Sequence, residues 1–255
     1  MPIQIITVPC LADNYAFLLH DPDTQQTALV DAPETDPIVQ ELNARGWTLT
    51  HIFLTHHHWD HVDATETLRE KYAPKVIGAQ ADAHRLPKLD LALSDGQKFS
   101  FADHDVHTID VPGHTVGHIA FFIPKLHALF SADSLMALGC GRLSEGSAEQ
   151  MFTSLEMLAG LPIRTVVYSG HEYTEANGRF AITVDPENAE LKARVADIRQ
   201  ARSQNKPTVP SELALELATN PFLRCGTPAI RNAVGLPNAP TLDVFTELRR
   251  RKDNF

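Results

Sequence analysis

Four histidines and one aspartate crowd into the segment THHHWDH (residues 55–61), directly after the apolar run HIFL. Alternate side chains of an extended chain share a face, so His56 and His58 can contact one metal ion. If the chain then turns, Asp60 and His61 can offer an oxygen and a nitrogen to a second ion. Mixed imidazole and carboxylate donors suit Zn²⁺, Mn²⁺ or iron. The segment therefore predicts a metal site rather than a polar loop that is rich in histidine by chance.

Two metal sites need more ligands than this segment holds, and three polar residues elsewhere follow apolar runs. His114 lies in VPGHTVGH after the run HDVHTID, Asp133 ends HALFSAD, and His171 follows TVVYSG. Loops at the ends of strands commonly carry functional groups. Each of these residues alone is a weak signal, because turns and caps use the same residue types. Together with the first cluster they predict one composite metal centre.

Length and charge limit the class of protein. The chain has 255 residues, enough for one large domain with a smaller appendage, and it has no apolar run of transmembrane length. The start MPIQIITVPC has neither a basic nor an apolar leader pattern, which favours the cytoplasm. A net charge of −10 disfavours nucleic acid and anionic membranes as partners. An anionic substrate would therefore need a local basic patch.

Neither a serine nor a cysteine nucleophile is indicated. The motif G-x-S-x-G is absent. Cys10, Cys140 and Cys225 are far apart and odd in number, which predicts reduced, buried thiols rather than disulfides or a CxxC site. Water activated by the predicted metal ions can serve as the nucleophile instead.

Short β-rich runs alternate with helical patterns up to about residue 172. The runs that predict strands are 14–21, 27–32, 51–56, 75–80, 104–111, 118–123, 127–133 and 165–170. Residues 36–46 predict a helix, and Ser147 with Gln150 forms the capping-box pattern of another. From about residue 173 only helical patterns remain, at 186–204 and 241–252, separated by a Pro-containing loop at 203–212. We expect an α/β sandwich followed by a small helical domain.

The ordered motifs THHHWDH, PGHTVGH, FSADSL and GHEYT resemble those of the metallo-β-lactamase superfamily, and its glyoxalase II branch most closely. The segment GCGRLSEG (139–146) and the tail LRRRKDNF (248–255) are similar to that branch, and the resemblance spans the whole chain. It implies an αββα metallo-β-lactamase-like sandwich at residues 1–172 and a small all-helical substrate-binding domain at 173–255. It also implies hydrolysis of S-D-lactoylglutathione to D-lactate and glutathione, the second step of methylglyoxal detoxification.

The resemblance also implies a binuclear site with two divalent ions, zinc being expected and iron or manganese being alternatives. The implied ligands are a trio for each ion and one bridging carboxylate: His56, His58 and His114; Asp60, His61 and His171; and Asp133. The carboxylates of Asp60 and Asp133 would position the metal-bound hydroxide that attacks the thioester. The implied contacts to the glutathione thioester are Arg142, Tyr173, Arg249 and Lys252. Ser144 stands where the family often has an aromatic ring, so one contact to glutathione is lost.

Other activities on the same fold remain alternatives. The fold also hosts lactonases and glutathione persulfide dioxygenases, and a non-catalytic metal-binding module is a further alternative. The complete ligand set, GHEYT and the basic tail favour the thioester hydrolase. The expected assembly is a monomer.

Overall fold

The first sheet combines antiparallel and parallel pairing. The computed structural model describes residues 2–255. In that range this sheet has six strands in the order β1-β2-β3-β4-β5-β6. Their bounds are β1 (Gln4–Cys10), β2 (Asn14–Asp21), β3 (Gln26–Val30), β4 (His51–Phe53), β5 (Lys75–Ala79) and β6 (Leu91–Leu93). Strands β3 to β6 pair in parallel, so the loops that follow β3, β4 and β5 leave from the same edge.

The second sheet has its strands in the order β14-β13-β10-β9-β8-β7. Their bounds are β7 (Lys98–Phe101), β8 (His104–Asp110), β9 (Ile119–Ile123), β10 (Ala128–Ala132), β13 (Val166–Ser169) and β14 (Ser211–Glu212). A separate hairpin joins β11 (Leu135–Met136) to β12 (Gly139–Cys140). All eight predicted strands form. The short β14 lies in the region predicted to be entirely helical, so that expectation needs this correction.

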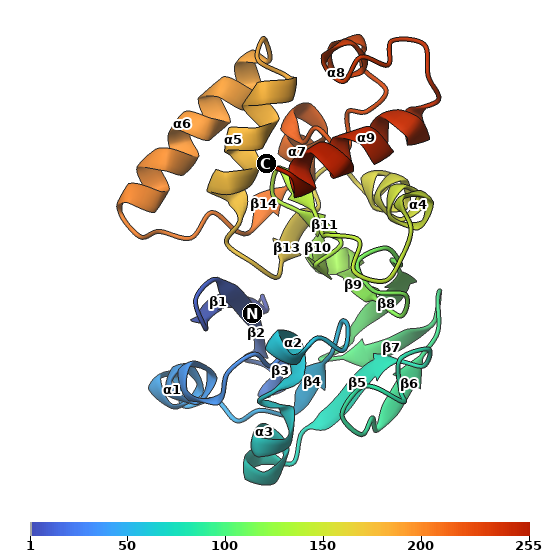
Figure 1. Ribbon diagram of the computed structural model, residues 1–255. Coiled ribbons are helices and arrows are strands. Elements are labelled where there is room, and N and C mark those ends of the chain that lie inside the picture. The colour runs from blue at the N-terminus through green and yellow to red at the C-terminus, as the bar shows by residue number, and fades with distance from the viewer. Residues whose placement is uncertain (1) are drawn as a thin grey trace. The chain divides into compact units, whose positions relative to one another are not determined.

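The chain divides into two compact units. The first comprises the chain up to Asp110 together with Gly117–Ser131, and the second comprises Val111–Val116 together with Ala132–Phe255. Helices of the first unit are α1 (Thr35–Arg45), α2 (Trp59–Val62), α3 (Thr65–Tyr72) and the 3₁₀ turn η1 (Pro124–Leu126). Helices of the second are α4 (Ala148–Ala159), α5 (Thr174–Val184), α6 (Ala189–Ser203), α7 (Leu213–Thr219), α8 (Pro228–Ala233) and α9 (Thr241–Asp253) (Figure 1).

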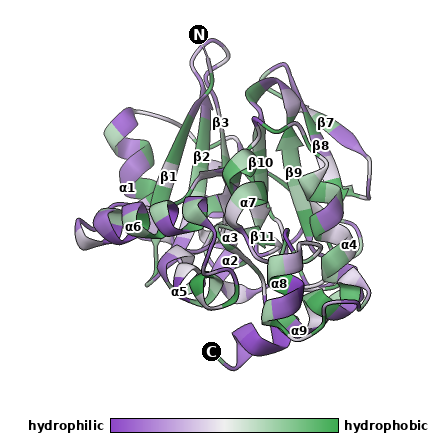
Figure 2. Ribbon diagram, turned by 90° about the horizontal axis from the view of Figure 1, so that it is seen from above, coloured by the Kyte–Doolittle hydropathy of each residue, from purple (hydrophilic) through white to green (hydrophobic). Residues whose placement is uncertain are grey.

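Aromatic side chains join the two sheets inside the first unit. The ring of Phe53 on β4 lies 5.0 Å from that of Phe99 on β7 and 5.4 Å from that of Phe121 on β9. Phe17 on β2 and Phe130 on β10 have ring centroids 5.8 Å apart. Hydrophobic residues predominate along β9 in Figure 2, whereas α6 carries many hydrophilic ones. The predicted α/β sandwich is confirmed.

Local signals explain how the helices of the second unit begin and pack. The predicted capping box forms at α4, where Ser147 accepts a hydrogen bond from the Gln150 amide and Gln150 accepts one from the Ser147 amide. Apolar faces of α5 and α6 meet in a cluster of buried side chains: Leu138, Ala181, Leu191, Val195 and Ile198. Within residues 2–255, none of the helices combines the length and the apolar character that a membrane crossing demands.

A buried ion pair connects the helices of the second unit to the β11–β12 hairpin. Glu216 on α7 is fully buried and pairs with Arg194 on α6. The Glu216 carboxylate also accepts hydrogen bonds from the Ser211 hydroxyl at 2.7 Å and from the Leu138 amide at 2.9 Å. Asn220 donates to the carbonyls of Met136 and Gly139. The hairpin is therefore held by satisfied buried polar groups rather than by apolar packing alone.

We expect Glu216→Leu to lower the free energy of unfolding by about 3–5 kcal/mol, because it leaves the Arg194 guanidinium buried without its carboxylate. The double variant Arg194→Met/Glu216→Leu should recover most of that loss. Urea unfolding gives the midpoints and slopes. Lys192→Ala, which breaks the exposed pair with Glu187, serves as the control and should shift the midpoint little. A double variant that is less stable than Glu216→Leu would contradict the interpretation.

Candidate metal centre

The loop that follows β4 presents a dense group of imidazoles. It leads from β4 into α2, which begins at Trp59. His56 and His61 are fully buried, and their ring centroids lie 4.2 Å apart. The rings of His56 and His58 are 4.8 Å apart, and an Asp60 carboxylate oxygen lies 3.9 Å from His61 Nε2. The turn expected after His58 is thus the start of a short helix.

A carboxylate and two imidazoles meet at the ends of three strands in the second sheet. Asp133 directly follows β10, His114 lies beyond the end of β8, and His171 lies beyond the end of β13. Asp133 Oδ2 lies 3.4 Å from His114 Nε2 and 3.3 Å from His171 Nε2. All three residues are buried. One carboxylate oxygen therefore faces the outward nitrogens of two histidines at once, which is the arrangement that a bridging ligand requires.

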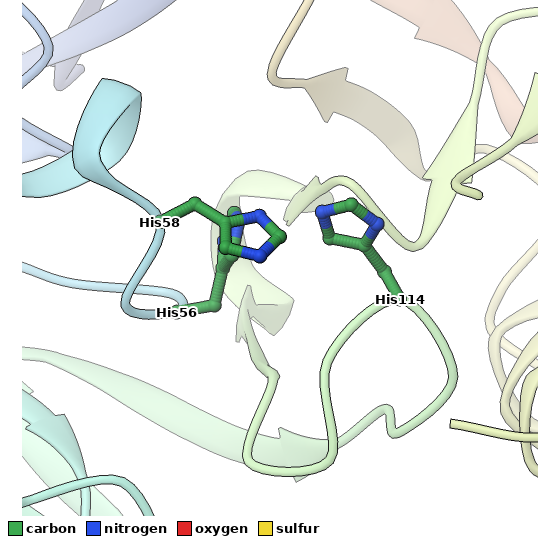
Figure 3. Close-up of side chains that lie close together, drawn as sticks. All are labelled: His56, His58 and His114. Carbon is green, nitrogen blue, oxygen red and sulfur yellow. The ribbon is translucent and has the colours of Figure 1, made fainter. Parts of the chain in front are cut away.

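The donor atoms form three compact groups. Within each group they lie within 4.8 Å of one another: His56, His58 and His114; His56, His61 and Asp133; and Asp60, His61 and His171. Figure 3 shows the first group, with His56 and His58 on the loop after β4 and His114 on the turn after β8. The seven predicted ligands make up these groups. Their mixture of nitrogen and oxygen donors suits a divalent transition metal. Which residue binds which ion stays a prediction.

Hydrogen bonds to the inner nitrogens fix the tautomers of three predicted ligands, His56, His61 and His114. His114 Nδ1 lies 2.8 Å from the Arg142 carbonyl oxygen, which can only accept, so Nδ1 carries the proton. His61 Nδ1 donates to Asp31 Oδ2 at 2.8 Å. The Thr55 hydroxyl donates to the same carboxylate and so accepts from His56 Nδ1 at 3.0 Å. Each Nε2 is left with the lone pair that metal coordination uses, and the residues fit the ions.

Asp31 and Asn14 contribute to this arrangement but were not predicted from the sequence. Asp31 is buried just beyond β3, with a left-handed φ of 57°, and it also accepts the Thr55 amide at 2.9 Å. Such backbone strain is tolerated where surrounding contacts enforce it. Asn14 donates to the carbonyl and carboxylate of Asp60. Asp31 directly follows the apolar residues of the run TALVDA, so the signal that identified Asp133 could have identified it as well.

Close packing behind Asp133 explains the glycine at position 141. A Cβ at Gly141 would lie 1.9 Å from the Asp133 carbonyl oxygen and 3.2 Å from His114 Cβ. No side chain fits there without moving the backbone that carries Asp133. The adjacent Arg142 contributes its carbonyl to His114, while its side chain is exposed.

The four predicted substrate contacts differ in their surroundings. Tyr173 is 39% exposed, and its ring stacks on His171 with a centroid distance of 4.7 Å. Arg249 is only 4% exposed and donates to the Cys140 carbonyl at 2.9 Å. It also pairs with Asp253 at 2.7 Å. The Arg249 guanidinium therefore serves an internal contact, and its binding to substrate stays a prediction.

Lys252 lies in a cationic environment on α9. Partial burial and then the nearby charges of Arg249, Arg142 and Arg179 lower the pKa of its ammonium group. Arg142 and Arg179 are exposed. A local basic cluster therefore exists in a chain of net charge −10. Arg179 was not predicted, because a single arginine on a helical face carries no distinctive sequence signal.

The cysteines are unsuited to nucleophilic catalysis. Cys10, Cys140 and Cys225 are buried and free, as predicted. Burial raises the pKa of the Cys10 thiol to about 12 and also raises the pKa of the other two thiols. A thiolate, which is the reactive form, is therefore disfavoured at neutral pH.

Comparisons with known proteins identify the family. A family model described as metallo-beta-lactamase superfamily matches residues 13–171, and one described as hydroxyacylglutathione hydrolase C-terminus matches residues 172–255. A hydroxyacylglutathione hydrolase from Ruegeria pomeroyi is 60% identical over 255 residues, which is 100% of each chain.

Two solved structures share the fold. The BLEG-1 B3 metallo-beta-lactamase has a TM-score of 0.67 at 20% identity, covering 86% of this chain and 99% of that one. TTHA1623, solved in a di-iron-bound form, has a TM-score of 0.62 at 24% identity, covering 86% of this chain and 100% of that one. At such identities the likeness concerns the fold alone.

The fold, the ligand groups and the family model make this chain a member of the metallo-beta-lactamase superfamily, and the chain binds two divalent metal ions. Its full-length similarity and its C-terminal match show that it belongs to the hydroxyacylglutathione hydrolase, or glyoxalase II, family. The resemblance seen in the motifs is thereby confirmed.

We expect Asp133→Asn to weaken binding of both ions, because an amide cannot bridge them as an anion. Elemental analysis of the purified variant should give clearly fewer than two divalent ions per chain. Asp105→Asn on β8 removes an exposed carboxylate and should keep the wild-type content. Two tightly held ions in Asp133→Asn would argue against a bridging role.

Proposed function

We propose that this chain is a metal-dependent thioester hydrolase that converts S-D-lactoylglutathione and water to D-lactate and glutathione. The observation that carries the proposal is the Asp133 carboxylate oxygen, which faces both His114 and His171 at 3.3–3.4 Å. A carboxylate shared in this way supports a binuclear hydrolytic centre. The full-length relative named hydroxyacylglutathione hydrolase supports the substrate class and its place in methylglyoxal detoxification.

The proposed ligands divide into a trio for each ion and a bridge: His56, His58 and His114; Asp60, His61 and His171; and Asp133. When bound, two divalent ions supply Lewis acidity at the thioester carbonyl and lower the pKa of a water nucleophile. The chain's own carboxylates, Asp60 and Asp133, then orient that water by accepting its hydrogen bonds. Asn14 holds Asp60 for this task through the 3.1 Å contact to its carboxylate. The departing thiolate is a stable leaving group, so no proton donor is required.

Zinc is the proposed metal, with iron or manganese as alternatives. Imidazole and carboxylate ligands support zinc but accept the other two. Elemental analysis of protein purified from cells grown without metal supplements distinguishes them. We also propose that the protein is a cytoplasmic monomer. We propose further that it binds no nucleic acid, which the net charge of −10 supports.

Substrate recognition is proposed to lie mainly in residues 173–255, with residues 1–172 carrying the chemistry. Arg142, Tyr173, Arg249 and Lys252 are the proposed contacts to glutathione. The cationic environment of Lys252 supports a site for a carboxylate. Tyr173, stacked on His171, would bring its hydroxyl to the substrate close to the metal centre. Arg249 is proposed to act chiefly by supporting the Cys140–Gly141 backbone next to Arg142.

Lactonase and persulfide dioxygenase activities, and a purely structural metal site, are less well supported. We expect thiol release from S-D-lactoylglutathione to be far faster than turnover of a lactone, a β-lactam or glutathione persulfide. Removing the ions with a chelator should abolish thiol release, and restoring them should recover it. Oxygen consumption with glutathione persulfide at a higher kcat/KM would instead favour the dioxygenase.

We expect Lys252→Ala to raise KM for S-D-lactoylglutathione about 10- to 150-fold, the equivalent of a charge-assisted contact of about 1.5–3 kcal/mol. The value of kcat should change far less, because Lys252 would contribute equally to ground-state and transition-state binding. Arg250→Ala removes the same charge from the exposed side of α9, where Arg250 pairs with Glu247, and should leave KM unchanged.

A short thioester without carboxylates provides a second control, since its hydrolysis should be indifferent to Lys252→Ala. Equal KM increases in Lys252→Ala and Arg250→Ala would show that substrate binding depends on the net electrostatic field of the protein rather than on a specific contact at Lys252. Arg249→Ala should lose stability as well as affinity, because its buried contact to Cys140 is lost.

A further inference from the structure

The imidazole of His57 has a polar partner outside the group of predicted metal ligands. It belongs to none of the three ligand groups, although it separates His56 from His58. Its Nδ1 lies 3.0 Å from a carboxylate oxygen of Asp82, on the loop that follows β5. Strands β4 and β5 are parallel neighbours, so their following loops leave from the same edge of the sheet. The contact therefore joins the metal loop, residues 54–58, to the adjacent loop.

Asp82 is held rigidly in this position. Its side chain is 1% exposed, and its second carboxylate oxygen accepts a hydrogen bond from Arg85 Nε at 3.1 Å. The Asp82 backbone carbonyl accepts the amides of Arg85 and Leu86 at 2.9 Å each. A buried carboxylate needs such a partner, and Arg85 supplies both charge and hydrogen bonds. The arginine thus allows a charged group to be placed behind the metal loop.

A third segment, residues 117–119, packs against the Asp82 carboxylate. A Cβ at Gly117 would lie 2.2 Å from Asp82 Cγ, so the backbone at 117 must carry no side chain. The next residue, His118, stacks on the ligand His56 with ring centroids 4.6 Å apart. The Ile119 amide donates to the Thr55 carbonyl at 3.0 Å. Asp82 therefore lies where the metal loop and the segment 117–119 converge.

We propose that Asp82 is a positioning residue for the metal centre, acting through His57 to fix the backbone from which His56 and His58 reach their ion. The His57 ring is held by Asp82 and lies 5.0 Å from the His58 ring, so the loop cannot rotate and withdraw either imidazole. Arg85 neutralises the carboxylate, and Gly117 provides the space for it. The proposal rests on the assignment of His56 and His58 as ligands, but it does not depend on the identity of the substrate.

The first test measures metal affinity in Asp82→Asn by competition with a chromophoric chelator. Partners that orient metal ligands typically contribute 10- to 100-fold in affinity, so one of the two ions should bind about 10- to 100-fold more weakly. Asp90→Asn is the matched control, because Asp90 also pairs with an arginine, Arg69, and accepts a backbone amide, but at Val76 in β5. It should keep both wild-type affinities. Wild-type affinity for both ions in Asp82→Asn would overturn the proposal.

His57→Ala tests the same link but keeps the buried Asp82–Arg85 pair. A loss of metal affinity in this variant therefore cannot be attributed to unfolding caused by the loss of that pair. It should weaken the same ion, and the double variant His57→Ala/Asp82→Asn should be no weaker than Asp82→Asn, since both changes break one link. Additive losses would overturn the proposal.

Visible spectra of the cobalt-substituted proteins should change in His57→Ala but not in Asp90→Asn. These readouts need no substrate, so a failed thioester assay would count against the proposed function only.

Discussion

The metal centre depends on which nitrogen of each ligand imidazole carries the proton. An imidazole can bind a metal only through a nitrogen with a free lone pair, and acceptors at Nδ1 reserve Nε2 for that role in His56, His61 and His114. For His61 the acceptor is Asp31, and for His114 it is the Arg142 carbonyl. Asp31 also controls His56 through the Thr55 hydroxyl. One buried carboxylate thus sets the tautomers of two ligands.

The sheets place these acceptors by simple geometry. Asp31 and the metal loop follow parallel neighbours, β3 and β4, so they emerge together at one edge. Beyond the second sheet, Gly141 permits the backbone to pass directly behind Asp133. Arg249 donates to the carbonyls on either side of that passage, at Cys140 and Gly141. The polar residues behind the site are consequently as constrained as the ligands.

The sequence was most informative where one short segment contains the whole signal. The crowded segment 55–61 and the apolar strands that precede His114 and Asp133 predicted the metal ligands' types and the sandwich. The pairings of Asp31 and Asp82 could not be predicted, because their partners lie 24 to 30 and 25 positions away along the chain. Only the parallel register of the strands brings these groups together. The burial of Arg249 escaped prediction for another reason: a basic run normally indicates a solvated surface, whereas this guanidinium finds backbone carbonyls inside the fold.

The origin of the ligands around Asp133 has a consequence for the lifetime of the protein. His114, Asp133 and His171 come from separate strand ends, so the unfolded chain does not hold them together. Ions that bind only the assembled arrangement stabilise it by mass action. Binding of these ions then contributes part of the free energy of folding. Metal scarcity would raise the fraction of chains that open and are degraded, so the supply of metal governs abundance as well as catalysis.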